Sequence, residues 1–218
     1  KSERPRPVHI EIPLDIITAP AGHLKAHSAP APSRPAPHMA TIEQAARLLG
    51  AAKQPLVLLG GGTIEAATDA LALVEALDAP CCCTINAKGV LPKGHPLSLG
   101  SNQSLPPVRN LALQADVVLA IGTELGETDY DVVFDGNFRL GGRLIRVDID
   151  ADQLQRNFAA EVAINSDAGA AMRALLEELG GAKPLLSGSP GSERVSKVRA
   201  ALDSQWPPMW LAVGRLLE

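Results

Sequence analysis

Aromatic residues are scarce in this sequence. They make up 3% of the 218 residues, although 46% of the residues are hydrophobic. The core must therefore consist mainly of alanine, valine, leucine and isoleucine side chains. A chain of this length and apolar content can bury one substantial core, with room for parts of neighbouring units.

Positive charge is neither in excess nor gathered in one block. The chain has 20 Lys and Arg residues against 24 Asp and Glu residues, which gives a formal net charge of −4. Proteins that bind nucleic acids or membrane surfaces usually carry a basic patch, so we expect neither partner. No apolar run is long enough to span a bilayer, and no signal peptide is apparent at the start.

Reactive and metal-binding side chains are few and poorly spaced. The three cysteines are consecutive, from Cys81 to Cys83, and neighbouring residues of a strand point to opposite faces, so they cannot form one metal site. The five histidines are scattered, and there is no G-x-S-x-G nucleophile motif. We therefore expect a reduced, cytoplasmic protein with no metal site of its own.

Short apolar runs that end in glycine or aspartate are the main feature of the sequence. They read PLVLLGGGTIEAA from Pro55, ADVVLAIGTELGE from Ala115 and RLIRVDIDADQL from Arg143. A continuous apolar run followed by helix-forming residues is typical of a buried parallel strand. Strands that alternate with helices predict an α/β fold: a doubly wound, mostly parallel sheet with helices on both faces, Rossmann-like and of the type that binds NAD or FAD.

The same patterns predict the individual elements. Strands are expected at 8–13, 56–59, 80–85, 117–121, 144–149 and 162–165. Helices are expected from Thr41, at 65–77, at 108–114 and after Asp167. Thr41 and Gln44 fit a capping box, and Asp167 is expected to cap the last of these helices.

Changes in composition divide the chain into five parts. Residues 19–40 and 181–194 are rich in Pro, Ala, Gly and Ser, which is typical of extended linkers. Between them, residues 41–180 form the predicted Rossmann-like domain. Residues 1–18 and 195–218 are expected to belong to neighbouring domains, and we expect the protein to continue beyond both ends.

One edge of the predicted sheet is the candidate cofactor site. Open α/β sheets bind ligands at the carboxyl ends of their strands. The candidate residues at that edge are Gly60, Gly61, Gly62, Gly122, Thr123, Asp148 and Asp150. The glycines could bring backbone N–H groups close to a pyrophosphate, and the aspartates could accept hydrogen bonds from ribose hydroxyls. The alternative is that the glycines form only a tight turn and that the aspartates cap the next helix.

Taken in order, these segments resemble the central domain of thiamine-diphosphate-dependent enzymes, a family that includes acetolactate synthase and benzoylformate decarboxylase. The resemblance rests on HIEIPLDI near the start, the first linker, the Pro55 to Gly62 turn, the loop from Lys88-Gly89 through His95-Pro96 to Gly100, the Ala115 to Gly122 strand, and Asp148 to Asp150. The loop GTELGETDYDVVFDG, residues 122–136, most resembles members known as acetolactate synthase-like proteins or 5-guanidino-2-oxopentanoate decarboxylases.

The resemblance implies a division of labour between domains. In the family, a pyrimidine-binding domain precedes the central domain and a diphosphate-binding domain follows it. Those two domains hold thiamine diphosphate and Mg²⁺, and their motifs are absent from this chain. The resemblance therefore implies a scaffold without catalytic residues that does not bind thiamine diphosphate itself, within a homodimeric or homotetrameric parent enzyme.

The loop after the second glycine turn departs from the flavin-binding members of the family. Acetolactate synthases that hold FAD carry an Arg-Phe-Asp-Asp-Arg run just after this strand. Here the residues are Glu124, Leu125, Gly126, Glu127 and Thr128. Acids in place of arginines repel a diphosphate, so we do not expect FAD, although an adenine nucleotide such as ADP stays an open alternative.

The leading hypothesis is therefore the central domain of a 2-oxo acid decarboxylase or an acetolactate synthase-like carboligase that uses thiamine diphosphate. The alternative is a nucleotide-binding module that holds FAD, NAD or ADP. A sirtuin-like deacylase shares the predicted fold, but its zinc-binding cysteine quartet and its catalytic histidine context are missing.

Overall fold

The computed structural model describes residues 4, 7–22, 24–25, 27–28, 30, 32–130, 138–180 and 189–204. Their centre is a five-stranded sheet in the order β2-β1-β3-β4-β5. The strands are β1 (Pro55–Leu59), β2 (Cys81–Cys83), β3 (Val117–Ile121), β4 (Arg143–Asp148) and β5 (Val162–Asn165). Every neighbouring pair is parallel, so the predicted doubly wound α/β fold is confirmed.

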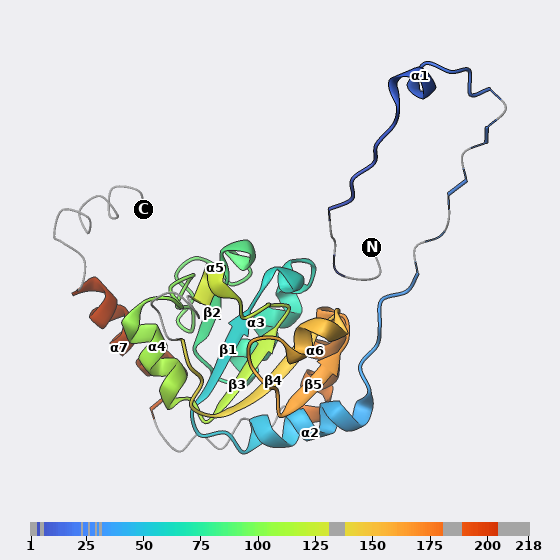
Figure 1. Ribbon diagram of the computed structural model, residues 1–218. Helices are drawn as coiled ribbons and strands as arrows, with labels where there is room; N and C mark the ends of the chain where they lie inside the picture. The colour runs from blue at the N-terminus through green and yellow to red at the C-terminus, as the bar shows by residue number, and fades with distance from the viewer. Residues whose placement is uncertain are drawn as a thin grey trace.

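Helices cover both faces of the sheet (Figure 1). Helices α2 (Met39–Gly50), α3 (Ala67–Ala76) and α6 (Ala168–Leu179) cover one face, where they bury the larger apolar cluster. Helices α4 (Pro106–Gln114) and α7 (Gly191–Asp203) cover the other face. The central strands are buried on both sides, which explains why β1 and β3 read as continuous apolar runs rather than as alternating patterns.

The three cysteines divide between these two cores. Cys81 and Cys83 lie in the cluster beneath α2, α3 and α6, whereas Cys82 lies in the cluster beneath α4 and α7. All three are buried free thiols. The neighbouring cysteines therefore point to opposite faces of the sheet, as predicted.

The two predicted helix caps have different outcomes. Asp167 is the N-cap of α6, and its Oδ1 accepts a hydrogen bond from the Ala170 N–H at 3.0 Å, as predicted. The Thr41 capping box is wrong, because α2 begins at Met39 with His38 as its N-cap. The Thr41 hydroxyl instead donates to the His38 carbonyl oxygen from within the first turn, at 2.7 Å.

Four short helices complete the connections between these elements. They are η1 (Gly61–Ala66), η2 (Ile85–Ala87), α5 (Glu127–Tyr130) and η3 (Ala151–Gln155). The helix predicted at 65–77 is divided into η1 and α3, because the backbone of Ala66 leaves the helical region with φ −125° and ψ 35°. None of the helices in the described part of the chain is long and apolar enough to cross a membrane.

The strand predicted at 8–13 is wrong. Residues 7–13 form no strand and lead into a one-turn helix, α1 (Leu14–Ile17). Their alternating apolar side chains are exposed: Val8 is 83% exposed and Ile10 76%. A strand requires a hydrogen-bonded neighbour, and neither edge strand of the sheet, β2 or β5, pairs with this segment.

Helix α7 begins inside the segment predicted as the second linker. Its first residue, Gly191, is buried, and Val195 and Leu202 pack into the core beneath α4. A Cβ atom on Gly191 would lie 2.1 Å from the Asp78 carbonyl oxygen, so the glycine permits this close approach. The first residue of α7 therefore packs on the domain, and the five domain boundaries stay a prediction.

Candidate functional site

The carboxyl ends of the strands border a cleft of about 800 Å³. Its lining comes from η1 and the turns that follow β2, β3, β4 and β5. The lining includes five of the seven residues that the sequence singled out as a cofactor site: Gly61, Gly62, Gly122, Thr123 and Asp148. Gly60 and Asp150 are not among the lining residues. Parallel strands that converge on one edge explain why residues so far apart in sequence meet here.

The two glycine turns are in direct backbone contact with each other. A Cβ atom on Gly60 would lie 2.1 Å from the Gly122 carbonyl oxygen, and one on Gly122 would lie 2.7 Å from the Gly62 Cα. The Gly60 N–H donates to the Ile121 carbonyl at 2.8 Å, and the Gly62 N–H donates to the Gly122 carbonyl at 3.2 Å. These two N–H groups are already used within the protein, so the geometry favours a tight packing role for Gly60 and Gly62 over a pyrophosphate cradle.

A buried arginine in β4 donates hydrogen bonds to the backbone of the loop after β3. Arg146 lies within β4 and is 1% exposed. Its guanidinium donates to the carbonyls of Arg156 at 2.6 Å, Thr123 at 3.2 Å and Glu124 at 3.3 Å. Burial lowers the pKa of Arg146, with the Asp148 carboxylate opposing that shift. Arg146 was not predicted as a site residue, although an arginine flanked by apolar residues in the middle of a buried strand was a usable signal.

The Thr123 side chain also stabilises the loop after β3. Its hydroxyl lies 3.2 Å from the Tyr130 hydroxyl and accepts a hydrogen bond from the Leu125 N–H at 3.3 Å. Leu125 is buried and adopts φ 51°, a strained value for leucine that these contacts maintain. The Thr123 side chain is thus committed to the shape of the loop rather than free for a ligand.

The two aspartates at the end of β4 have separate roles. Asp148 is buried, and its Oδ1 accepts a hydrogen bond from the Asp150 N–H at 2.9 Å. Burial raises the pKa of Asp148, because the charged form is partly desolvated. Asp150 is the N-cap of η3 and accepts from the Asp152 N–H at 3.0 Å. Asp150 therefore caps the next helix, as the alternative interpretation of these aspartates predicted, while Asp148 lines the cleft.

Negative charge predominates along the cleft. Six carboxylate residues line it: Glu65, Glu124, Glu127, Asp129, Asp148 and Asp167. Two arginines face them, Arg4 and Arg34, and the Arg4 guanidinium pairs with the Glu124 carboxylate. Glu124 and Glu127, which stand where flavin-binding members of the family have arginines, are thus both part of the cleft lining.

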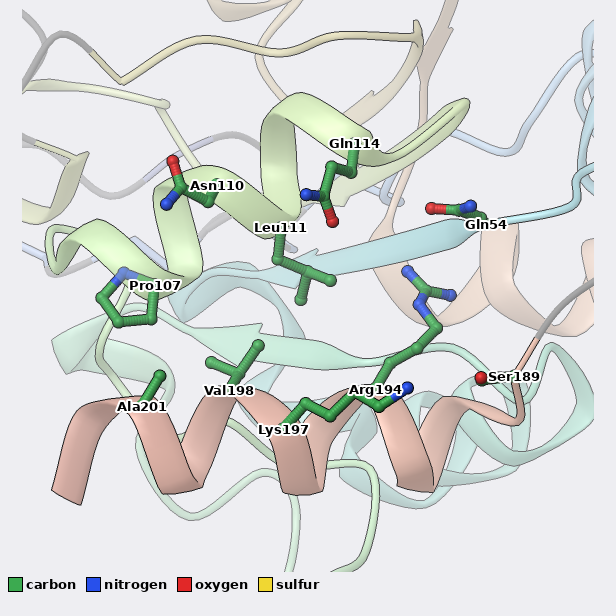
Figure 2. Close-up of a pocket in the computed structure, with 10 residues that line it drawn as sticks. All are labelled: Gln54, Pro107, Asn110, Leu111, Gln114, Ser189, Arg194, Lys197, Val198 and Ala201. Carbon is green, nitrogen blue, oxygen red and sulfur yellow. The ribbon is translucent and has the colours of Figure 1, made fainter. Parts of the chain in front are cut away.

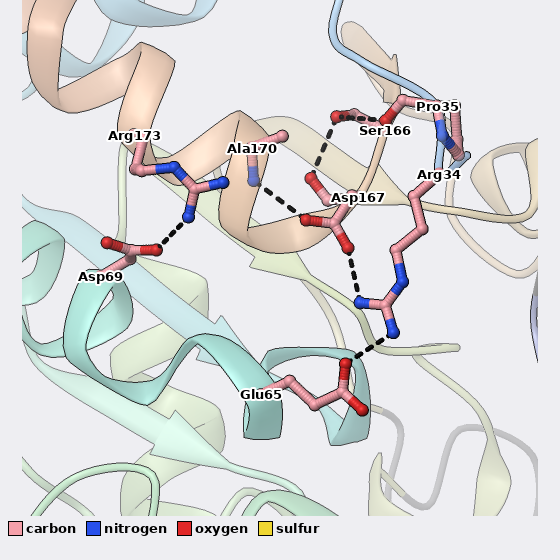
Figure 3. Close-up of polar contacts among 8 residues, drawn as sticks. All are labelled: Arg34, Pro35, Glu65, Asp69, Ser166, Asp167, Ala170 and Arg173. Carbon is pink, nitrogen blue, oxygen red and sulfur yellow. Dashed lines mark hydrogen bonds and ion pairs between the residues drawn. The ribbon is translucent and has the colours of Figure 1, made fainter. Parts of the chain in front are cut away.

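Arg34 fastens the first linker to the rim of the cleft (Figure 3). Its guanidinium donates to Asp167 Oδ2 at 2.8 Å and to Glu65 Oε2 at 2.5 Å, so it joins α6 to η1. The Pro35 carbonyl accepts from the Asp167 N–H at 2.9 Å. We call these contacts of Arg34 and Pro35 the connector clasp. Although burial raises the pKa of Asp167, the Arg34 hydrogen bond, together with backbone N–H donors, holds it below its usual value.

Comparison with known proteins identifies the family. A family model for the central domain of thiamine pyrophosphate enzymes matches residues 42–175, which include all five strands. The chain belongs to this family. The predicted resemblance is therefore confirmed, and thiamine diphosphate is the cofactor of the enzymes that contain this domain.

Relatives of the chain have two kinds of described activity. It is 37% identical over 209 residues to a probable 2-ketoarginine decarboxylase of Pseudomonas aeruginosa, a match that covers 95% of this chain and 36% of the relative. It is 32% identical over 202 residues to the large subunit of acetolactate synthase isozyme 1 of Escherichia coli, covering 88% of this chain and 33% of the relative. The chain thus spans about a third of the length of the relatives it matches.

Solved structures confirm the fold of this central domain. A putative thiamin diphosphate-dependent enzyme from Mycobacterium smegmatis superimposes with a TM-score of 0.62 at 22% identity, covering 76% of this chain and 32% of that chain. Benzoylformate decarboxylase from Polynucleobacter necessarius gives a TM-score of 0.58, also at 22% identity, over 70% of this chain and 29% of that chain. At this level of identity the likeness concerns the fold alone.

Proposed function

We propose that this domain is the structural centre of a larger thiamine-diphosphate-dependent enzyme that decarboxylates or ligates 2-oxo acids. The observation that carries the proposal is the family match over residues 42–175, within relatives about three times as long as the chain. The flanking partners in this proposal are a pyrimidine-binding domain, of which residues 1–18 are the end, and a diphosphate-binding domain, which residues 195–218 approach.

In the proposed arrangement the flanking domains hold the cofactor. Thiamine diphosphate acts as the electron sink for the reaction, and the protein positions it. Two observations support a site outside this chain. The carboxyl-edge cleft is lined mainly by carboxylates, which repel a diphosphate, and no group of three or more metal-ligating side chains gathers in the part of the chain that the structure describes.

This domain would then act through its shape. Arg146 and Thr123 hold the loop after β3, and the connector clasp fixes where the preceding linker meets the sheet. Flanking domains attached at fixed points are held in a defined relation to each other, which is what a cofactor site between domains requires. We further propose a cytoplasmic, homodimeric or homotetrameric parent enzyme.

Activity measurements test this function directly. The 218-residue chain and a longer product of the same gene, with its own flanking sequence, are each assayed for CO₂ release from 2-oxo acids with thiamine diphosphate and Mg²⁺. We expect release from the longer protein only. Turnover by the 218-residue chain, or no turnover by a folded longer protein with any 2-oxo acid, would contradict the proposal.

A nucleotide-binding module is the second candidate function. The observation in its favour is the cleft itself. It lies at the carboxyl edge near β1 and β3, the neighbouring strands whose following connections lead to opposite halves of the sheet. We expect no flavin there, because Glu124 and Glu127 line it. The purified protein should be colourless and should show no thermal shift with FAD. A yellow preparation, or stabilisation above about 1–2 kcal/mol by FAD or ADP at saturation, would favour this candidate instead.

A further inference from the structure

A second cavity, of about 380 Å³, lies between α4 and α7 (Figure 2). It shares no lining residue with the carboxyl-edge cleft. Gln54, which directly precedes β1, lines one part of it, so the cavity reaches toward the amino end of that strand. It therefore lies apart from the carboxyl edge of the sheet.

The wall that α7 contributes is fixed in place. The Gly191 N–H at the start of the helix donates to Asp78 Oδ2 at 3.0 Å. Near its other end, Arg199 donates to the carbonyl oxygens of His95 at 2.9 Å and Ser98 at 2.7 Å. Hydrogen bonds near both ends therefore fix the position of α7 on the domain.

The lining of this cavity combines apolar and polar residues, and it carries positive charge. Leu111 and Val198 are its buried apolar residues. Three side-chain amides, one hydroxyl residue and two cations also line it: Gln54, Asn110, Gln114, Ser189, Arg194 and Lys197. No carboxylate residue is among the lining residues, although the chain as a whole has a net charge of −4.

Arg194 is the central group of this lining. It is half-buried, its side chain extends between the two helices in Figure 2, and it donates to the Pro55 carbonyl at 3.0 Å. Burial lowers the pKa of Arg194, and the Asp116 and Asp78 carboxylates oppose that shift. Asp78 accepts from the Gly191 N–H, and Asp116 accepts from the backbone N–H groups of residues 53 and 54 at 2.7 and 2.9 Å. Within the described residues Arg194 forms no ion pair, so its other N–H donors remain available.

Lys197 adds a second cation one turn along α7. Its ammonium pairs with the Glu193 carboxylate at 2.7 Å, and both side chains are largely exposed. An exposed i, i+4 pair of this kind is weak, so an anion in the cavity can compete for the ammonium.

We propose that the cavity between α4 and α7 binds a small organic anion that carries a carboxylate or phosphate group. The anionic group is bound by Arg194 and Lys197, and the amides of Gln54, Asn110 and Gln114 bond the polar remainder of the molecule. Charge-assisted hydrogen bonds from a guanidinium are the strongest contacts available to such an anion. The volume falls within the range of about 300–1,000 Å³ that is typical of small-molecule sites.

Calorimetric titration of the full 218-residue chain tests this site. Succinate and inorganic phosphate are the two probes, each at constant ionic strength, with sodium chloride as the control for non-specific charge. We expect saturable binding of at least one probe. Binding of succinate alone assigns a carboxylate ligand, and binding of phosphate alone assigns a phosphate ligand. Heats no larger than those of sodium chloride with both probes would overturn the proposal.

Three exposed positions supply the variants. Lys197→Gln removes one of the two cations and should weaken binding by at least about fivefold. Gln114→Glu places a carboxylate in the lining and should abolish binding. Lys88→Gln removes an exposed lysine far from the cavity and should leave binding unchanged. Equal affinity in all three variants would overturn the proposal, even if the chain binds a probe elsewhere.

Discussion

At Gly60 and Gly122 the two central turns of the sheet touch through their backbones, and this contact leaves no room for a side chain. A Cβ atom on Gly60 would lie 2.1 Å from a backbone oxygen, an atom that no side-chain rotation can move. The identity of single residues therefore sets how closely the turns after β1 and β3 approach.

Gly60→Ala should destabilise the domain. Overpacking of a well-packed core costs about 1–3 kcal/mol, and we expect the upper part of that range because the clash involves the backbone. Chemical denaturation of the variant and of the parent chain measures the change. Gly50→Ala is the matched control: its Cβ meets nothing within 4 Å, so it should be neutral or stabilising by up to about 1 kcal/mol. Equal stability of the Gly60 variant and the parent chain would contradict the contact.

Asp148 should make stability depend on pH. Its pKa is raised in the folded state by burial, so ionisation above its unfolded pKa of about 3.9 costs folding free energy. Asp148→Asn cannot ionise and keeps an oxygen that can accept from the Asp150 N–H. We expect the variant to match the parent chain near pH 3.9 and below, and to exceed its unfolding free energy at pH 7.

Denaturation curves across that pH range provide the measurement. Asp152→Asn removes a neighbouring exposed carboxylate and serves as the control for the change in net charge. If the Asp148 variant were less stable than the parent chain at pH 7, the buried carboxylate would be stabilising the fold, contrary to this account.

At the scale of elements, contacts with η1 and α6 fix the position of part of the first linker. The connector clasp joins residues 34 and 35 to η1 and α6, although the composition of this segment indicates only an extended linker. The clasp depends on partners 31 and 133 residues away along the chain, and local composition carries no information on such contacts.

Arg34→Ala should release the linker without unfolding the domain. The Asp167 N–H, which donates to Pro35, should then exchange its hydrogen faster, since the clasp holds its acceptor in place. Hydrogen exchange followed residue by residue measures this. Arg173→Ala is the matched control: it breaks a 2.6 Å ion pair with Asp69, between α6 and α3, and leaves Pro35 untouched (Figure 3). Equal exchange rates at Asp167 in both variants would exclude a specific role for Arg34.

The strands were the most predictable elements. A strand buried on both faces needs apolar side chains at every position, and β1 and β3 show this directly in the sequence. The segment 8–13 has a good strand pattern as well, but a pattern does not supply a hydrogen-bonded neighbour. The early start of α7 was missed because Gly191 resembles a linker glycine, whereas its role is to approach Asp78.

The candidate site was only partly predictable. The position of Gly62, Gly122 and Asp148 at one edge follows from the parallel topology. Arg146 and Arg34 were missed because each acts on backbone or side chains from distant elements. The use of the glycine N–H groups inside the turn also depends on the register between β1 and β3, which the sequence does not state.

At the scale of the whole molecule, we infer that this domain supplies the scaffold and that other parts of the enzyme supply the chemistry. The described residues form a double core around one parallel sheet, with an acidic cleft at its carboxyl edge. The family to which the chain belongs uses thiamine diphosphate, and the relatives are about three times as long as the chain. We attribute the cofactor-binding groups to the domains that flank this one in the proposed parent enzyme.

Calorimetric titration of the folded 218-residue chain with thiamine diphosphate in the presence of Mg²⁺ tests this separation most directly. We predict no heat beyond that of dilution, because the cleft repels a diphosphate and the described residues gather no metal-ligand group. Saturable binding in the micromolar range, about −8 kcal/mol or tighter, would contradict the account and assign cofactor binding to this chain.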